Sequence, residues 1–354
     1  MKYFSIYDLV GIQVCDEYPW VDTLFITHGI AKEGKAAYDA CQRKVHIIFK
    51  KELPMSDVRF IGEGAYIGDN VYVDEQYSVR IEKTSDKLIR LLVSQECNEW
   101  LVIAIQLSFL SCGYTLLHAA ALEKGGQVLL LPSWGGVGKT ATVCRFVREH
   151  GWRLLGDDLV VLGHGEVKPF LKPFVIYPYH KDLFPELFRS GENHTVKNLT
   201  VSSMMSRMIP GVKRMLRPFP RVLAYLRKHN PQSMRVSPRK IFTEEQISEG
   251  GVSMRMVWLE RSMKTEVFYG QISAETLSSK AVTVSCVELF AEKLESVYHM
   301  CGCGMLQYGE VFGRMHKIIC DEAEKVQCDL LEIPSSVEIT DVGEIIYQNL
   351  MTEK

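Results

Sequence analysis

Residues 133–140 constrain the fold of this chain more than any other part of its sequence. They read SWGGVGKT, follow the apolar run QVLLLP and precede a helical pattern that ends near Glu149. In a loop of the form G-x-x-x-x-G-K-[ST], backbone N–H groups point inward around phosphates, and the following helix adds its positive N-terminal end. A strand, a glycine-rich loop and a helix in this order predict an α/β nucleotide-binding sheet. The predicted phosphate-binding residues are Ser133, Trp134, Gly135, Gly136, Val137, Gly138, Lys139, Thr140 and Ala141.

Lys139 and Thr140 have separate predicted roles within this loop. The Lys139 ammonium is expected to reach the β- and γ-phosphates, and the Thr140 hydroxyl to coordinate Mg2+. The sequence departs from the strict motif at one position, because Ser133 stands in place of the first glycine. That position needs a tight turn more than phosphate contact, so serine is compatible with binding. ATP and Mg2+ are therefore the expected cofactors, and the alternative is a glycine-rich turn with an incidental Lys-Thr pair.

Asp157 and Asp158 stand between the apolar runs LL and LVVL, at a predicted strand edge beyond the loop. Two adjacent carboxylates can divide the work of phosphoryl transfer. One can hold Mg2+, and the other can accept the proton of an attacking hydroxyl. Adjacent like charges also raise the pKa of one partner, which suits a base. The alternative is an Asp-Asp turn between two strands.

His118 follows the apolar run TLL on a predicted strand that leads through a short turn into the strand before the loop. The two strands are expected to be neighbours. His118 then lies near the aspartates and tunes their protonation. The alternative is a histidine with a purely structural role in the core or at a strand edge.

The first part of the chain predicts a β-rich module, because short runs of β-branched and aromatic residues alternate with Gly, Asp, Asn and Pro. A helix is expected over residues 98–111. Residues 100–117 carry no charge, but their polar residues favour a buried helix followed by a strand over a membrane span. The expected strands are 22–29, 44–50, 59–64, 65–74, 77–83, 114–125, 127–133, 152–163 with a central turn, and 254–261. Further helices are expected over 139–149, 287–298, 312–325 and from residue 340.

Residues 193–243 contain no Asp or Glu but many Lys and Arg, with several prolines between them. This composition predicts a basic helical insertion of short helices joined by proline turns. It is compatible with binding phosphate or an acidic substrate, and a solvated helical face is the simplest alternative. Contact with a membrane surface or nucleic acid is also open on this stretch alone.

The chain resembles the HPr kinase/phosphorylase-like kinases over residues 116–162. The resemblance is carried by His118-Ala-Ala-Ala-Leu, the glycine loop between a strand and a helix, and Gly-Trp-Arg-Leu-Leu-Gly-Asp157-Asp158-Leu-Val-Val. It is greatest to the branch found beside peptide-modification gene clusters, which includes serine kinases that act on lasso peptides. The resemblance implies a P-loop fold related to phosphoenolpyruvate carboxykinase and phosphoryl transfer to a hydroxyl, usually that of serine. In the resemblance the loop binds phosphates, Asp158 matches the proposed base, Asp157 its acidic neighbour and His118 the nearby histidine. Together with the loop motif and the paired carboxylates, this leaves Thr140 and Asp157 as the expected Mg2+ ligands.

Three positions depart from the family pattern. Ser133 replaces the first glycine of the loop, and Gly135 replaces a common serine. Ala141 stands where the bifunctional enzymes often carry glutamate, and the second glycine-rich signature of those enzymes has no counterpart in this sequence. A kinase without phosphorylase activity is therefore the expectation.

These observations predict an α/β fold in which a β-rich N-terminal module (residues 1–96) precedes a P-loop kinase domain of the HPr kinase/phosphoenolpyruvate carboxykinase type (residues 97–354). The expected function is Mg-ATP-dependent phosphorylation of a hydroxyl, most simply a serine of a peptide or protein, with Asp158, Asp157, His118 and Lys139 as catalytic residues. A small-molecule kinase for an amino acid, sugar or antibiotic is one alternative. A nucleotide-binding regulatory module without phosphotransfer is another.

Composition adds expectations about location and partners. The net charge of −2 does not point to nucleic acid or membrane. Ten cysteines without a regular framework indicate a reducing compartment, and hence the cytoplasm. The resemblance also allows a homo-oligomer. A zinc site at His299, Cys301, Cys303, His316 and Cys320 has suitable residue types, but the C-x-C spacing favours ordinary free thiols.

Overall fold

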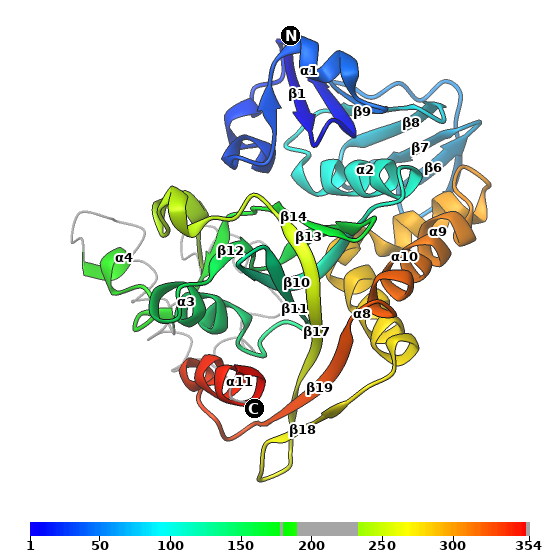
Figure 1. Cartoon of the computed structure of the whole chain (residues 1–354). Coiled ribbons are helices and arrows are strands. Elements are labelled where there is room, and N and C mark those ends of the chain that lie inside the picture. The colour runs from blue at the N-terminus through cyan, green and yellow to red at the C-terminus, as the bar shows by residue number, and fades with distance from the viewer. Residues whose placement is uncertain (178–179, 190–232, 352–354) are drawn as a thin grey trace, which may run out of the picture.

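The computed structural model describes residues 1–177, 180–189 and 233–351. Within these ranges the chain has a mixed α/β architecture with two large sheets, and its first part is rich in strands. Figure 1 shows the N-terminal sheet above the second sheet, with helix α2 (Asn98–Ser111) between them. Within the described residues no helix combines the length and the apolarity that crossing a membrane requires.

The N-terminal sheet has nine strands in the order β3-β1-β2-β4-β9-β8-β7-β6-β5. Its pairs are antiparallel except that β4 runs parallel to both β2 and β9. A short helix, α1 (Lys35–Ala40), packs on β1 and β2. The strands are β1 (Lys2–Ile6), β2 (Val10–Val14), β3 (Lys32–Glu33), β4 (Arg43–Phe49), β5 (Arg59–Gly62), β6 (Ala65–Gly68), β7 (Val71–Asp74), β8 (Val79–Ser85) and β9 (Leu88–Val93).

The strand predicted over residues 22–29 is wrong. These residues form two 3-10 helices, η1 (Val21–Thr23) and η2 (Phe25–His28). Leu24, Phe25 and Ile26 are all buried, whereas a half-buried strand would alternate buried and exposed positions. The Asn98 Oδ1 atom accepts a hydrogen bond from the Phe25 N–H at 3.0 Å. Tertiary anchoring to α2 therefore overrides the β propensity of this run.

The second sheet contains eight strands that come from residues 115–334. Its main path is β11-β10-β13-β14-β17-β19-β18, β12 pairs with β10, and β17 also pairs with β11. The strands are β10 (Thr115–Lys124), β11 (Gln127–Pro132), β12 (Arg153–Gly156), β13 (Leu159–Gly163), β14 (Glu166–Phe170), β17 (Gly251–Ser262), β18 (Phe268–Gln271) and β19 (Gln327–Pro334). The predicted hairpin at residues 114–133 and the two strands around Asp157-Asp158 are confirmed.

Helices cover both faces of this sheet, and β10 shows why. Its side chains alternate between two core clusters: Leu116 and Ala120 pack with α3 (Lys139–Glu149), and Leu117 and Ala119 pack with α8 (Ala274–Phe290) and α10 (Arg314–Ala323). Successive side chains of a strand point to opposite faces, so an unbroken apolar run suits a strand that is buried on both sides. In Figure 1, α3 and α8 lie on opposite sides of the sheet.

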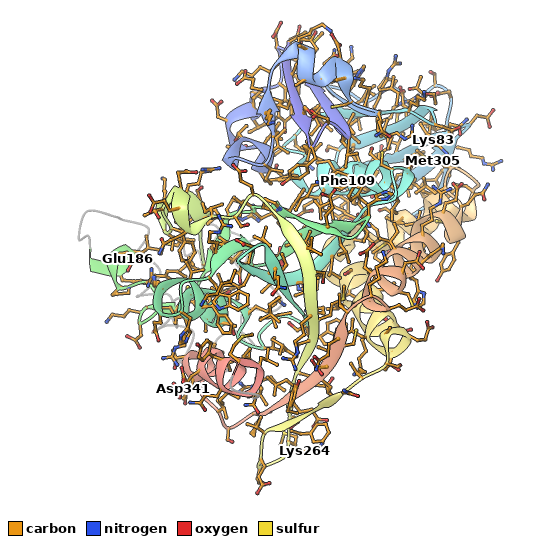
Figure 2. All side chains as sticks on the ribbon, viewed as in Figure 1. Lys83, Phe109, Glu186, Lys264, Met305 and Asp341 are labelled. Atoms are coloured by element: carbon orange, nitrogen blue, oxygen red, sulfur yellow. The ribbon has the colours of Figure 1, made fainter. Side chains whose placement is uncertain are left out.

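α2 is buried almost all round because it packs against both sheets. Its contacts include β4 of the first sheet and β10 of the second. The phenyl ring of Phe109 is fully buried and points into the packed side chains between the two sheets (Figure 2). The uncharged run that began at residue 100 is therefore a core helix followed by a strand, as predicted.

The later helices differ in detail from the prediction. The helix expected over 287–298 begins earlier, as α8, and breaks at Ala291, where φ is +43°, before η6 (Ala291–Lys293) and α9 (Leu294–Gly302). A π turn, η7 (Gly309–Gly313), precedes α10. The last helix, α11 (Val342–Met351), follows η8 (Ile339–Asp341) and packs against α3 (Figure 1).

Most of the predicted basic insertion, residues 193–232, lies outside the described residues. The described remainder contains β16 (Met234–Val236), which pairs with β15 (Phe174–Ile176), and two 3-10 turns, η4 (Pro238–Lys240) and η5 (Glu244–Gln246). The short helix α4 (Pro185–Arg189) precedes the undescribed stretch. The expected helices are therefore not found in the described end of the insertion.

Candidate functional site

The glycine loop, residues 133–140, connects β11 to α3. Ser133 forms a parallel bridge with Leu259, so the loop leaves the sheet beside β17. Ser133, Val137, Gly138, Lys139 and Ala141 are buried, Thr140 is partly buried, and Trp134, Gly135 and Gly136 are exposed. Residues 134–136 of the loop are thus exposed to solvent, whereas its lysine lies in the interior.

Lys139 is 8% exposed, and three acceptors surround its ammonium. Its Nζ atom donates to the carbonyl oxygens of Ser133 at 3.0 Å and Trp134 at 2.9 Å, and it lies 3.0 Å from His118 Nε2. Burial lowers the pKa of Lys139, and the charges of Asp158, Asp157 and Glu288 oppose this effect. A buried ammonium needs such acceptors because an unpaired charge is costly to desolvate.

Gly136 and Gly138 have the left-handed backbone that the loop requires, with φ of +77° and +106°. A Cβ atom at Gly136 would meet no atom within 4 Å. A Cβ atom at Gly138 would lie 2.9 Å from the Cβ atom of Val342, the first residue of α11. Gly138 therefore serves two purposes: it allows the turn into α3, and it lets α11 pack directly beneath the loop.

Thr140 and Asp157 lie together on the inner side of the loop. The Thr140 hydroxyl donates to Asp157 Oδ2 at 2.8 Å, while the buried Asp157 Oδ1 has no hydrogen-bond partner among the described residues. Burial raises the pKa of Asp157 to about 7; the Thr140 hydrogen bond opposes this rise and Asp158 adds to it. Hydroxyl and carboxylate oxygens are the ligand types that Mg2+ prefers. These two residues therefore fit a Mg2+ ion, which would also satisfy the unpaired oxygen.

His118 links the loop lysine to the second aspartate, which confirms the predicted proximity. Its Nδ1 atom lies 3.2 Å from Asp158 Oδ1. A lysine ammonium can only donate, so His118 Nε2 accepts from Lys139 and the ring proton is on Nδ1, facing Asp158. Burial lowers the pKa of His118 to about 4 against the opposing charge of Asp158. The neutral ring with its proton on Nδ1 is thus the form that this site stabilises.

Asp158 has a second partner that the sequence argument did not identify. Lys172, in the turn after β14, places its Nζ atom 2.6 Å from Asp158 Oδ2. Burial favours the neutral acid, but Lys172, His118 and Lys139 outweigh it and hold the pKa of Asp158 well below its ordinary range. Adjacent carboxylates were expected to raise one pKa. The pKa of Asp157 is raised, whereas the pKa of the proposed base Asp158 is lowered, because the cations lie next to Asp158.

Helix α8 supplies two further residues that the sequence argument missed. Ser285 Oγ accepts a hydrogen bond from the His118 backbone N–H at 3.0 Å. Glu288, one helical turn later, is exposed, and its carboxylate lies 3.4 Å from the position of a Cβ atom at Gly135. The predicted helix began at residue 287, too late to place Ser285 on it, and Lys172 belongs to no motif. Neither contact had a recognisable sequence signal.

The loop, the aspartates and His118 open into one cavity of about 1150 Å3. Its walls come from parts of the chain that are far apart in sequence: the η1–η2 region and the start of α2, the turn after β14, the β15–β16 pair, η4 and the end of α8. The cavity is larger than most sites for a single small ligand. Its volume therefore exceeds what one small ligand requires.

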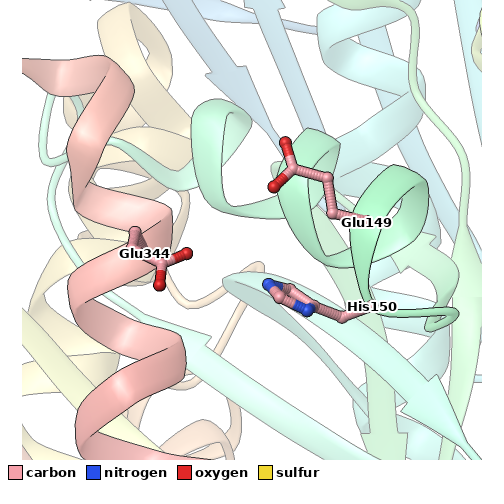
Figure 3. Close-up of side chains that lie close together, drawn as sticks. All are labelled: Glu149, His150 and Glu344. Carbon is pink, nitrogen blue, oxygen red and sulfur yellow. The ribbon is translucent and has the colours of Figure 1, made fainter.

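The zinc alternative is wrong. In the described part of the chain, the only group of three or more His, Cys, Asp or Glu side chains close enough to share a metal ion is Glu149, His150 and Glu344 (Figure 3). His299, Cys301, Cys303, His316 and Cys320 form no such group. The group in Figure 3 lies at the far end of α3 from the loop. Arg145 already pairs with both of its carboxylates, at 3.3 and 3.2 Å, so it has a structural explanation.

No model of a known protein family matches this chain, and no curated protein sequence matches it.

Replacing Gly138 by alanine should destabilise the protein by about 3 kcal/mol, because left-handed strain adds to a clash with Val342. Gly136→Ala is the matched control: it introduces the same kind of backbone strain into open space and should cost about 1 kcal/mol. Urea unfolding of both variants measures the difference. Equal losses would show that α11 does not pack beneath Gly138.

The ring of His118 should titrate far below an ordinary histidine, with a midpoint of about 4. Because the folded pKa is below the unfolded one, the unfolded state binds the proton first. About 3 kcal/mol of stability is then present above pH 6.5 and is lost as the pH falls towards 4. NMR titration measures the midpoint, with His118→Gln to assign the signal. A midpoint at or above 6.5 would contradict the buried, neutral ring.

Proposed function

We propose that this protein is a Mg-ATP-dependent kinase that transfers the γ-phosphoryl group to a hydroxyl. The observation that carries the proposal is the convergence, in one cavity, of the glycine loop with its buried lysine, the Thr140–Asp157 pair and the His118–Asp158 pair. The P-loop kinase type of fold is part of this proposal. It is supported by the order strand, glycine loop and helix, and by α helices on both faces of the sheet.

In this proposal the loop N–H groups and the N-terminus of α3 bind the phosphates, and Lys139 donates to the β- and γ-phosphates in exchange for its present acceptors. Thr140 and Asp157 hold Mg2+, which supplies positive charge against the phosphate oxygens. This exchange is favourable, because Lys139 gives up neutral acceptors and gains anionic oxygens, to which its hydrogen bonds are stronger.

Asp158 orients the acceptor hydroxyl and receives its proton. The hydroxyl oxygen forms a bond to the γ-phosphorus, the bond from that phosphorus to the β–γ bridging oxygen breaks, and ADP leaves with those electrons. His118 holds the Asp158 carboxylate through Nδ1–H, and Ser285 holds the backbone of His118. These two contacts fix the direction of the carboxylate, as orientation within the site requires.

The lowered pKa of Asp158 favours one alternative, a nucleotide-binding module that has lost phosphotransfer, because a carboxylate stabilised by Lys172 is a weak base. The transition state of phosphoryl transfer is loose, however, and positioning and charge stabilisation contribute more than proton removal. A site that holds its carboxylate firmly is compatible with such a reaction. Kinase activity therefore remains the function that the geometry supports best.

Incubation with γ-labelled ATP, Mg2+ and a panel of peptide and small hydroxyl acceptors tests the proposal. Lys139→Ala should reduce transfer by about 10³-fold or more, because it removes charge stabilisation at the phosphates. Asp158→Asn should reduce transfer by about 10²- to 10⁴-fold while ATP affinity changes little. Lys124→Ala, an exposed lysine outside the cavity, is the control.

Two results would contradict parts of this account. An Asp158→Asn variant that keeps most of its transfer rate would remove the proposed base. ATP binding by the unchanged protein, with neither transfer to any acceptor nor slow hydrolysis, would favour the module without phosphotransfer.

A further inference from the structure

One wall of the cavity is basic, and it begins at the proposed base. The Lys172 ammonium pairs with Asp158. Arg235 on β16 and Lys240 on η4 also line the cavity and complete this basic wall. Arg235 pairs in register with Val175 of β15, and both residues are exposed to the cavity. The β15–β16 pair therefore holds Arg235 on a defined element next to the turn that carries Lys172.

Arg235 and Lys240 make no ion pair within the residues that the structure describes, whereas Arg239, between them, pairs with Glu244. Cations without a counter-charge in a concave site attract an anionic ligand, because the low-dielectric walls concentrate their field. Within the described residues, Arg235 and Lys240 are thus two cavity-lining cations without an ion pair, and Arg235 lies beside the segment that carries Lys172.

Carboxylates also line the cavity. Glu288 extends from α8 over Gly135, and Glu96, before α2, also lines the cavity. Glu96 accepts hydrogen bonds from Thr23 at 3.2 Å and Asn98 at 2.6 Å, neither of which neutralises it. These carboxylates repel an anion from the parts of the cavity that they line. An anionic molecule in the cavity is therefore favoured with its charge towards Arg235 and Lys240 and away from these carboxylates.

The phosphates already have a separate set of donors in the proposed function, namely the loop N–H groups, Lys139 and the N-terminus of α3. The molecule adjacent to Asp158 is the acceptor, so the basic wall is left to the acceptor. We infer that the acceptor carries an anionic group, such as a carboxylate, within a few bonds of its hydroxyl, and that Arg235 and Lys240 bind this group. The inference rests on the proposed function, because that function places the acceptor at Asp158.

A carboxylate next to a hydroxyl can come from an acidic residue beside serine in a peptide or from a free hydroxy acid. Two matched sets of probes separate these sources. The first is a blocked, fluorescein-labelled peptide in which two Asp, two Gln or two Lys residues flank one serine. The second is L-serine compared with L-serinamide, which lacks the carboxylate.

Binding of the peptides to the full-length protein, with Mg2+ and a non-hydrolysable ATP analogue present, is measured by fluorescence anisotropy. The Asp-flanked peptide should bind about tenfold more tightly than the Lys-flanked one, with the Gln-flanked peptide between them. Arg235→Gln combined with Lys240→Gln should remove this preference and leave the affinity for the ATP analogue within about twofold. If the free hydroxy acid is the source, L-serine should show the preference over L-serinamide in label transfer from γ-labelled ATP.

Arg314→Gln combined with Lys317→Gln is the matched control, since it removes the same charge from exposed positions on α10, outside the cavity. It should leave both affinities unchanged. The inference is overturned if the Lys-flanked peptide binds as tightly as the Asp-flanked one and L-serinamide accepts label as well as L-serine. It is also overturned if the Arg235 and Lys240 substitutions weaken binding of the ATP analogue rather than binding of the acceptor peptide. The basic wall would then bind the triphosphate.

The two proposals fail in different ways. Label transfer without any charge preference contradicts the acceptor inference and leaves the kinase proposal intact. A charge preference in binding that depends on Arg235 and Lys240, together with ATP binding but neither label transfer to any acceptor nor slow ATP hydrolysis, supports the anion site and contradicts the kinase.

Discussion

The site depends on one buried cation. Lys139 is held inside the protein, and a charge in that position is tolerable only if acceptors surround it. Two of the acceptors are carbonyl groups of the loop itself, which bends the backbone around the ammonium, and the third is His118. His118 must then carry its proton on Nδ1, which directs it to Asp158, and Asp158 in turn pairs with Lys172. The position of Lys139 thus sets the tautomer of His118 and, through it, one of the two contacts of Asp158.

The fold brings these groups together because the second sheet is covered on both faces. β10 carries His118 beside β11, which leads into the loop, and β13 begins directly after the aspartates. On one side α11 packs beneath Gly138, and on the other α8 is tied to His118 through Ser285. The first 102 residues of the chain add η1, η2 and the start of α2 to the cavity wall. The cavity is therefore lined by residues from both parts of the chain.

Local signals predicted the centre of the site but not its surroundings. The loop, α3 and the strands around Asp157 were predictable because a strand, a glycine turn and a helix leave a pattern in adjacent residues, and the contact of His118 with Asp158 followed from strand pairing. Lys172, Ser285 and Glu288 were not predictable, since only the tertiary fold brings them to the site. The same reason explains the wrong strand at residues 22–29, where the contact of Phe25 with Asn98 decides the conformation. The prediction of a raised pKa for the proposed base was also wrong, because the sequence does not reveal that Lys172 pairs with Asp158.

The claim on which the account rests is that the glycine loop binds a nucleoside triphosphate with Mg2+. Isothermal titration calorimetry of ATP into the full-length protein, with Mg2+ and with EDTA, and into Lys139→Ala, tests it most directly. One ATP per chain is expected to bind with Mg2+, much more weakly with EDTA, and not measurably to the Lys139→Ala variant. Absence of binding to the unchanged protein, or binding that is the same with and without Lys139, would contradict it.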